Sequence, residues 1–185
     1  NGEGQIYKTN LLVKMLCLTI NKLASLDPFG IGIEMEADKP GWCDSLNGLP
    51  GLLGSSTPEV FELYRQIVFI LDALKALKLD DTCKIPIPKE LHDFLKGIES
   101  LIKTLKRMSA KKKDFNYWDK SNSLKETYRL KTKLGFKGME KQLSIKELEN
   151  MLGVFLSRVK EARKKAYVQS ENTYATYFVN EVSKF

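Results

Sequence analysis

Carboxylates, a tryptophan and an asparagine lie close together in the stretch 31–57, which joins two strongly helical segments. In order they are Glu34, Glu36, Asp38, Trp42, Asp44 and Asn47. Cleavage of a glycosidic bond uses such a set: one carboxylic acid protonates the leaving oxygen, a second group delivers the nucleophile, and an aromatic face holds the sugar ring. Because Asp44 closely follows Trp42, an aromatic wall could raise its pKa towards that of a general acid.

Two other interpretations of this stretch stay open. The acids could be solvated or salt-bridged, with Trp42 as an anchor for the loop. A calcium site is a weaker alternative, because the acids do not follow the spacing of a calcium-binding loop. The stretch is long for an irregular connection and rich in Ile, Met, Leu and Trp, which favours a functional loop over a disordered one.

The composition is typical of one soluble domain: 185 residues, 43% hydrophobic and 29% charged. Cys17, Cys43 and Cys83 are widely spaced and form no zinc-binding or disulfide pattern, which favours a reduced, cytoplasmic setting. No motif predicts a metal or a cofactor, and no apolar run is long enough to predict a membrane span. The first residue is not Met and the last ones, YATYFVNEVSKF, follow a hydrophobic pattern, so we expect a piece of a longer protein.

Apolar residues at helical spacing predict a mainly α protein with five to six long helices. The expected helices are 8–26, 58–79, 88–108, 123–134 and 144–166. Residues 31–36 alternate as in an extended chain, 174–185 favour a strand or an aromatic-rich helix start, and 109–122 are expected to form a mobile excursion rich in Lys and aromatics. Long helices with a long functional loop after the first suit an α/α toroid better than a tight bundle.

The string PGWCDSLNGLPGLLGSS resembles the catalytic loop of cellobiose-phosphorylase-type enzymes and related six-hairpin glycosidases. In that family a Trp-Asn-Asp-Gly-Met-Asn stretch precedes a Gly-rich apolar run and a helix. Trp42, Asp44 and Asn47 match this pattern in identity and spacing. Cys43 and Ser45 stand where the family has Asn and Gly, departures that bear on the substrate and on phosphorolysis more than on the acid.

The resemblance implies that residues 1–185 are one helical segment of a larger (α/α)6 barrel, from a large bacterial member of the family. It implies inverting cleavage of a glycosidic bond, by hydrolysis or phosphorolysis, with Asp44 as the general acid. Trp42, Asn47, Glu34 and Glu36 are then expected to bind the sugar. The implied partners are an oligosaccharide, inorganic phosphate and the remainder of the barrel, without which the isolated piece is expected to be inactive.

A basic helical interaction module is the alternative. The net charge is +7, and Lys111–Lys113 precede Phe115, Tyr117 and Trp118, a set that could contact nucleic acid or an acidic partner. The lysines are nevertheless spread over every expected helix, which is typical of a solvated surface and makes nucleic acid the less favoured partner. The single histidine, His92, has no partners at the spacing of a catalytic triad.

Overall fold

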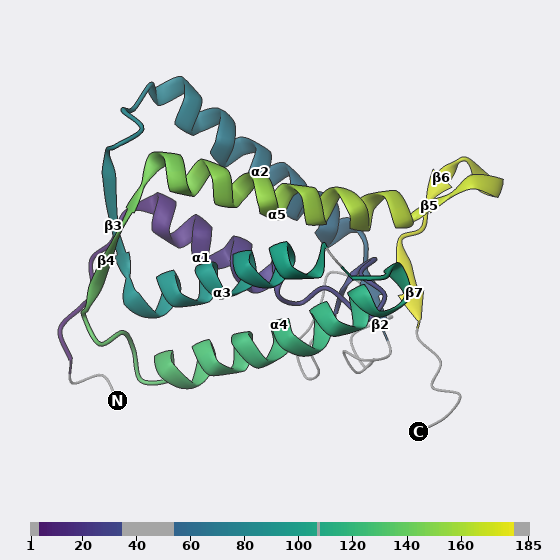
Figure 1. Cartoon of the computed structure of the whole chain (residues 1–185), viewed down its shortest axis with the longest axis horizontal. Helices are drawn as coiled ribbons and strands as arrows, with labels where there is room; N and C mark the ends of the chain where they lie inside the picture. Colours follow the sequence, from purple (N-terminus) through teal and green to yellow (C-terminus); the bar gives the residue numbers. More distant parts are fainter. Residues whose placement is uncertain (1–3, 35–53, 107, 180–185) are drawn as a thin grey trace.

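Five α-helices dominate the part of the chain that the computed structural model describes, residues 4–34, 54–106 and 108–179 (Figure 1). They are α1 (Leu11–Leu23), α2 (Pro58–Leu77), α3 (Lys89–Leu105), α4 (Ala110–Thr132) and α5 (Ile145–Lys165). The mainly α class predicted from the sequence is therefore confirmed. None of these helices combines the length and the apolar character needed to cross a bilayer.

The helix α3 lies at the centre of the helical layers, in contact with α1, α4 and α5, and α2 covers the outer side of α5 (Figure 1). The inward face of α3 is a stripe of buried apolar side chains at helical spacing, and α5 carries a similar stripe on the side that faces α3. The buried apolar residues are Leu91, Phe94, Leu95, Ile98, Leu101, Ile102 and Leu105 on α3, and Ile145, Leu148, Met151, Leu152, Phe155, Val159 and Ala162 on α5. Their packing forms the centre of one continuous core.

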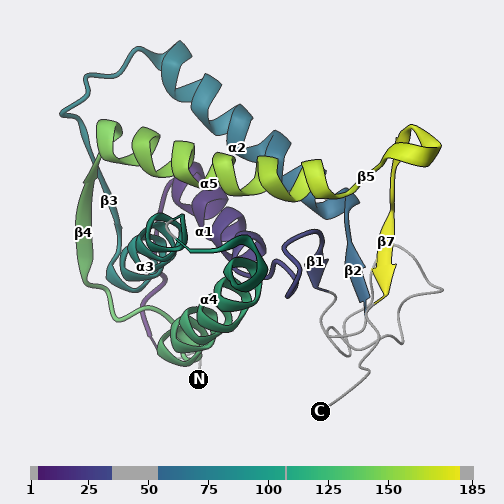
Figure 2. The same ribbon diagram turned by 45° about the vertical axis from the view of Figure 1, so that its right-hand side comes forward.

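Short strands join the helices at the two ends of this core (Figure 2). At one end, β3 (Lys84–Pro88) pairs antiparallel with β4 (Glu140–Ser144), with Pro86 opposite Gln142. At the other end, β1 (Ile33–Glu34), β2 (Gly54–Ser56) and β7 (Tyr177–Val179) form a sheet in the order β1-β2-β7. A small hairpin of β5 (Tyr167–Val168) and β6 (Thr173–Tyr174), with a 3-10 turn at Gln169–Glu171, connects α5 to β7.

Two helices begin at residues whose side chains are typical of helix caps. The side chain of Asn10 accepts a hydrogen bond of 3.0 Å from the Val13 N–H, which caps α1. Ser144 and Glu147 form the reciprocal capping box at the start of α5. At the start of α2 the N-cap residue is Thr57, whose side chain makes no capping hydrogen bond, and Pro58 is the first helical residue, whereas Ser55 and Ser56 are buried in β2.

The expectation of an excursion at residues 109–122 did not include a helix, but 110–122 belong to the long helix α4 together with most of the expected helix 123–134, and Ser109 is the N-cap residue of α4. The physical reason is that the inward side of α4 carries polar and aromatic groups in place of an aliphatic stripe. Tyr117 and Ser121 are fully buried and Lys125 is nearly so. A search for apolar residues at helical spacing cannot detect such a face.

The residues 174–185 contain strand rather than helix as far as the described chain extends. Tyr174 ends β6, and β7 completes the sheet beside β2. This agrees with one of the two predicted alternatives for that stretch.

Candidate functional site

Of the residues predicted to act on a substrate, Glu34 lies in the described part of the chain. Glu36, Trp42, Asp44 and Asn47 fall within residues 35–53 and thus lie outside the described residues. Glu34 ends β1 and stands opposite Ser55 of β2, so the chain on either side of 35–53 is held in adjacent antiparallel strands. The segment that carries the candidate acid is therefore anchored at both ends to the helical frame.

A tight turn built on Asp27 sets the direction of β1. The Asp27 N–H donates to the carbonyl of Gly32 over 2.9 Å, and the Glu34 N–H donates to the carbonyl of Ser25 over 2.8 Å. The fully buried Asp27 carboxylate accepts three backbone N–H bonds of 2.9 to 3.0 Å from inside the turn. Their donors are Phe29, Ile31 and Gly32. A carboxylate satisfied in this way fixes the backbone that leads to Glu34.

The Glu34 side chain is half-buried against α4. Trp118 donates its indole N–H to Glu34 Oε1 over 2.5 Å. The ammonium of Lys125, itself buried, donates to the hydroxyl of Ser25 over 3.1 Å. Burial raises the pKa of Glu34 and outweighs the Trp118 hydrogen bond and the Lys125 charge, which both act to lower it; the charge of Asp27 adds to the rise. Glu34 is therefore a carboxyl group that holds its proton to higher pH than a solvated glutamate does.

Side chains of α4 at a spacing of four residues attach that helix to the chain around the end of α1. These contacts join Tyr117 to the Leu23 carbonyl (2.8 Å), Ser121 to the Ala24 carbonyl (3.0 Å) and Lys125 to the Ser25 hydroxyl (3.1 Å). Residues four apart lie on one helix face, so a single face of α4 is hydrogen-bonded to the chain just before the Asp27 turn. Glu34, the Asp27 turn and α4 thus form one unit.

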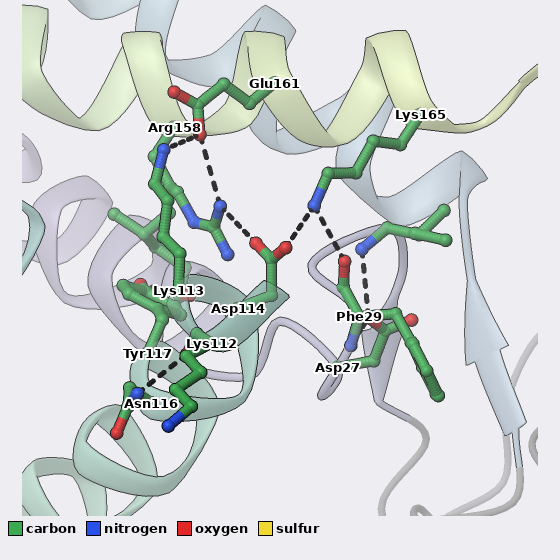
Figure 3. Close-up of polar contacts among 12 residues, drawn as sticks. Asp27, Phe29, Lys112, Lys113, Asp114, Asn116, Tyr117, Arg158, Glu161 and Lys165 are labelled. Carbon is green, nitrogen blue, oxygen red and sulfur yellow. Dashed lines mark hydrogen bonds and ion pairs between the residues drawn. The ribbon is translucent and has the colours of Figure 1, made fainter. Parts of the chain in front are cut away.

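A second cluster joins α4, α5 and the same turn through charged groups (Figure 3). Arg158 of α5 is buried, with its guanidinium 2.8 Å from Asp114 Oδ1 and 4.6 Å from the centre of the Tyr117 ring. Lys165 donates to Asp114 Oδ2 over 2.6 Å and to the carbonyl of Phe29 over 2.9 Å. The carboxylate of Asp114 therefore links both helices to the turn that precedes β1.

The electrostatics of this cluster are those of a structural ion network. Burial alone would raise the pKa of Asp114, but the hydrogen bonds and charges of Lys165 and Arg158 outweigh it and hold that pKa below its usual value. Glu161 behaves in the same way: Lys113 and Arg158 outweigh its burial and lower its pKa. Both carboxylates stay ionised at neutral pH, so their role is to hold Arg158 in place.

The described residues contain no group of three His, Cys, Asp or Glu side chains that could hold a metal ion. His92 lies on α3 with its ring nitrogen 3.4 Å from Asp93 of the same helix. Among the described cysteines, Cys17 contacts the Tyr128 hydroxyl at 3.3 Å and Cys83 is exposed. None of these side chains adds a reactive pair to the site.

Sequence reasoning did not connect Trp118 or Lys125 with Glu34. Trp118 is 84 positions away in the chain, and no local spacing relates the two. The available signal was an indole with a single N–H donor, which usually finds an acceptor when it is buried.

Comparisons with known proteins do not identify a family for this chain. No protein-family model matches the chain, and a search of curated proteins finds no match.

Proposed function

We propose that this chain is part of a carbohydrate-active protein that cleaves a glycosidic bond with inversion, by hydrolysis or phosphorolysis. The observation that carries the proposal is the sequence pattern of Trp42, Asp44 and Asn47 in a segment whose two ends pair in β1 and β2. This pairing supports the proposal because it brings the residues on either side of that segment together beside the helices. A larger α/α toroid, to which this chain contributes helices, and a cytoplasmic setting belong to the same proposal.

In the proposed reaction Asp44 protonates the glycosidic oxygen while phosphate or a base-activated water attacks the anomeric carbon from the opposite face. Trp42 supplies an aromatic surface for the sugar ring, and Asn47 and Glu36 bond to its hydroxyl groups. Glu34 is suited to the same work, because its half-buried carboxyl group already accepts the Trp118 N–H at Oε1 and can bond to further hydroxyl groups.

The alternative, a basic module that binds nucleic acid, has less support from the described contacts. Lys113 is paired with Glu161 at 2.8 Å, and Tyr117 is fully buried, so neither is available to a strand of nucleic acid. Both belong to the set of Lys111–Lys113, Phe115, Tyr117 and Trp118 on which that interpretation of the sequence was based. Stacking of bases needs exposed aromatic faces next to unpaired cations.

The test replaces Asp44 in the intact natural protein. We expect Asp44→Asn to lower turnover of an oligosaccharide by roughly 10²–10⁴-fold, the usual contribution of general acid catalysis, and to leave sugar binding in place. An aryl glycoside with an acidic phenol as leaving group should recover much of the lost rate, because that group departs without a proton.

The matched control is Asp38→Asn, which removes a carboxylate of the same segment that has no assigned role. Turnover close to that of the natural protein in Asp44→Asn would refute the assignment. An equal loss in both variants would show a general effect of charge in place of a specific acid.

A further inference from the structure

An aromatic pair lies on the surface of α4 beside Glu34. The rings of Phe115 and Trp118 are 5.3 Å apart between centroids and tilted by 46°. Phe115 is 57% exposed, although Tyr117, two residues further along the helix, is completely buried. The three aromatics of this stretch are thus divided: Tyr117 serves the core, whereas Phe115 presents its ring to solvent.

The orientation of the Trp118 ring is fixed in advance. The Trp118 indole N–H is held by Glu34 Oε1 at 2.5 Å, and the Tyr117 hydroxyl secures the same turn of α4 to the Leu23 carbonyl at 2.8 Å. An aromatic surface held in this way loses little conformational entropy when a ligand covers it. Exposed aromatic rings in a preformed arrangement are a common feature of binding surfaces.

We propose that Phe115, Trp118 and Glu34 form a subsite for one pyranose ring of a neutral oligosaccharide. The C–H face of a pyranose can lie against the aromatic rings, and its hydroxyl groups can bond to the carboxyl group of Glu34 at the edge of the pair. This inference rests on the proposed function and adds to it a place where the substrate is held outside the segment that carries Asp44.

The position of the subsite suits that role. Glu34 is hydrogen-bonded to Trp118 of the aromatic pair. It is also the last residue of β1, which leads directly into residues 35–53. A sugar bound on α4 would therefore lie beside the root of the segment with the candidate acid. Binding energy gained at such a subsite can be used to position the bond that is cleaved.

The charges around the pair favour a neutral ligand over an anionic one. Asp114, which precedes Phe115 in α4, is bonded to Arg158 and Lys165, and Lys113 is paired with Glu161 at 2.8 Å. These charged groups already neutralise one another, so none of these cations is left to bind the phosphates of a nucleic acid. A sugar without charge meets hydrogen-bonding partners instead.

The experiment measures oligosaccharide binding by isothermal titration calorimetry. The protein is the intact natural protein carrying Asp44→Asn, so that ligands are not consumed. The probes are tetrasaccharides of β-linked glucose, α-linked glucose, mannose, xylose and galactose, and a thymidine oligonucleotide as the anionic comparison. In this background Phe115→Ala should weaken binding of the preferred tetrasaccharide by about fivefold to tenfold, as expected for loss of one aromatic contact.

The control is Phe69→Ala, which removes an aromatic ring of similar exposure, 60%, from α2. It should leave the affinity unchanged. A second variant, Trp118→Phe, keeps a ring but removes the N–H that holds Glu34, and should weaken binding less than Phe115→Ala. Phe115 is exposed, so its replacement is not expected to unfold the protein.

Each outcome decides the matter. Weakening by Phe115→Ala but not by Phe69→Ala supports the subsite. Equal binding in all variants overturns the subsite and leaves the role of Asp44 standing. Binding to none of the tetrasaccharides overturns both proposals, and binding of the oligonucleotide that depends on Phe115 overturns the subsite in favour of a nucleic-acid surface.

Discussion

Replacing Asp114 by Asn tests whether the buried charge of Arg158 needs its partner. Loss of one member of a buried ion pair typically costs about 3–5 kcal/mol, because the other charge stays buried without compensation. Here Glu161 remains 3.3 Å from the guanidinium and an amide oxygen can still accept a hydrogen bond. We therefore expect a smaller decrease, about 2–3 kcal/mol, in the free energy of unfolding at pH 7.

The assay is urea unfolding followed by tryptophan fluorescence, to which Trp42 and Trp118 both contribute; Trp118 lies one helical turn from Asp114 on α4. The pH dependence has a definite sign. Because the pKa of Asp114 is lowered in the folded state, its contribution is complete above the unfolded value, near about pH 4, and is lost as the pH falls through the folded value. The difference between the natural chain and Asp114→Asn should therefore be largest at neutral pH and shrink below about pH 4.

The control is Glu62→Gln, which breaks an exposed pair with Arg65 whose atoms are 2.6 Å apart. Exposed pairs contribute about 0–1 kcal/mol, so this variant should change the free energy of unfolding very little. If Asp114→Asn cost no more than Glu62→Gln, the conclusion that Arg158 depends on Asp114 would be refuted. A difference that persists undiminished at pH 3 would refute the electrostatic explanation.

Two further variants test the turn and the carboxyl group next to it. Gly30→Ala should destabilise the fold by about 2–4 kcal/mol in urea unfolding, because Gly30 has φ +63° and an added Cβ would lie 2.5 Å from Arg158 Nη2. Gly135→Ala, also at positive φ (+104°) but with no atom within 4 Å, should cost about 1 kcal/mol, and an equal cost at both sites would contradict the crowding. Trp118→Phe should raise the pKa of Glu34 further, because the N–H donor that favours its ionised form is lost; carbon NMR of the carboxyl group against pH measures this, and an unchanged pKa would argue against the hydrogen bond.

The helices α3 and α5 were predictable because their buried faces are aliphatic and repeat at helical spacing. The helix α4 was recognised only in its second half, since its inward contacts come from Tyr117, Ser121 and Lys125, each bonded to a group near the end of α1. A polar face of this kind becomes recognisable only when its partners are known. The spacing of residues within α4 does not identify the groups near the end of α1 to which they bond.

The pairing of the short strands and the contacts of the site likewise depend on residues that are far apart in the sequence. β3 and β4 are separated in sequence by α3 and α4, and half of their residues are exposed, so neither shows a pattern that predicts the pairing. For the site, the sequence identified Glu34 as a candidate but gave no indication of Trp118. Pro28 and Gly30, which follow Asp27, are typical turn residues, whereas the three N–H bonds to the Asp27 carboxylate are visible only in the fold.

The pairing of β1 with β2 makes residues 35–53 an exchangeable insert. Since Glu34 and Ser55 already face each other, a replacement of different length would start and finish at the same two points. Chain statistics predict that doubling the length of such a loop costs only about 0.6 kcal/mol. Related chains could therefore share this helical frame and differ entirely in the reaction they perform, and an engineer could graft foreign sequences between the two strands.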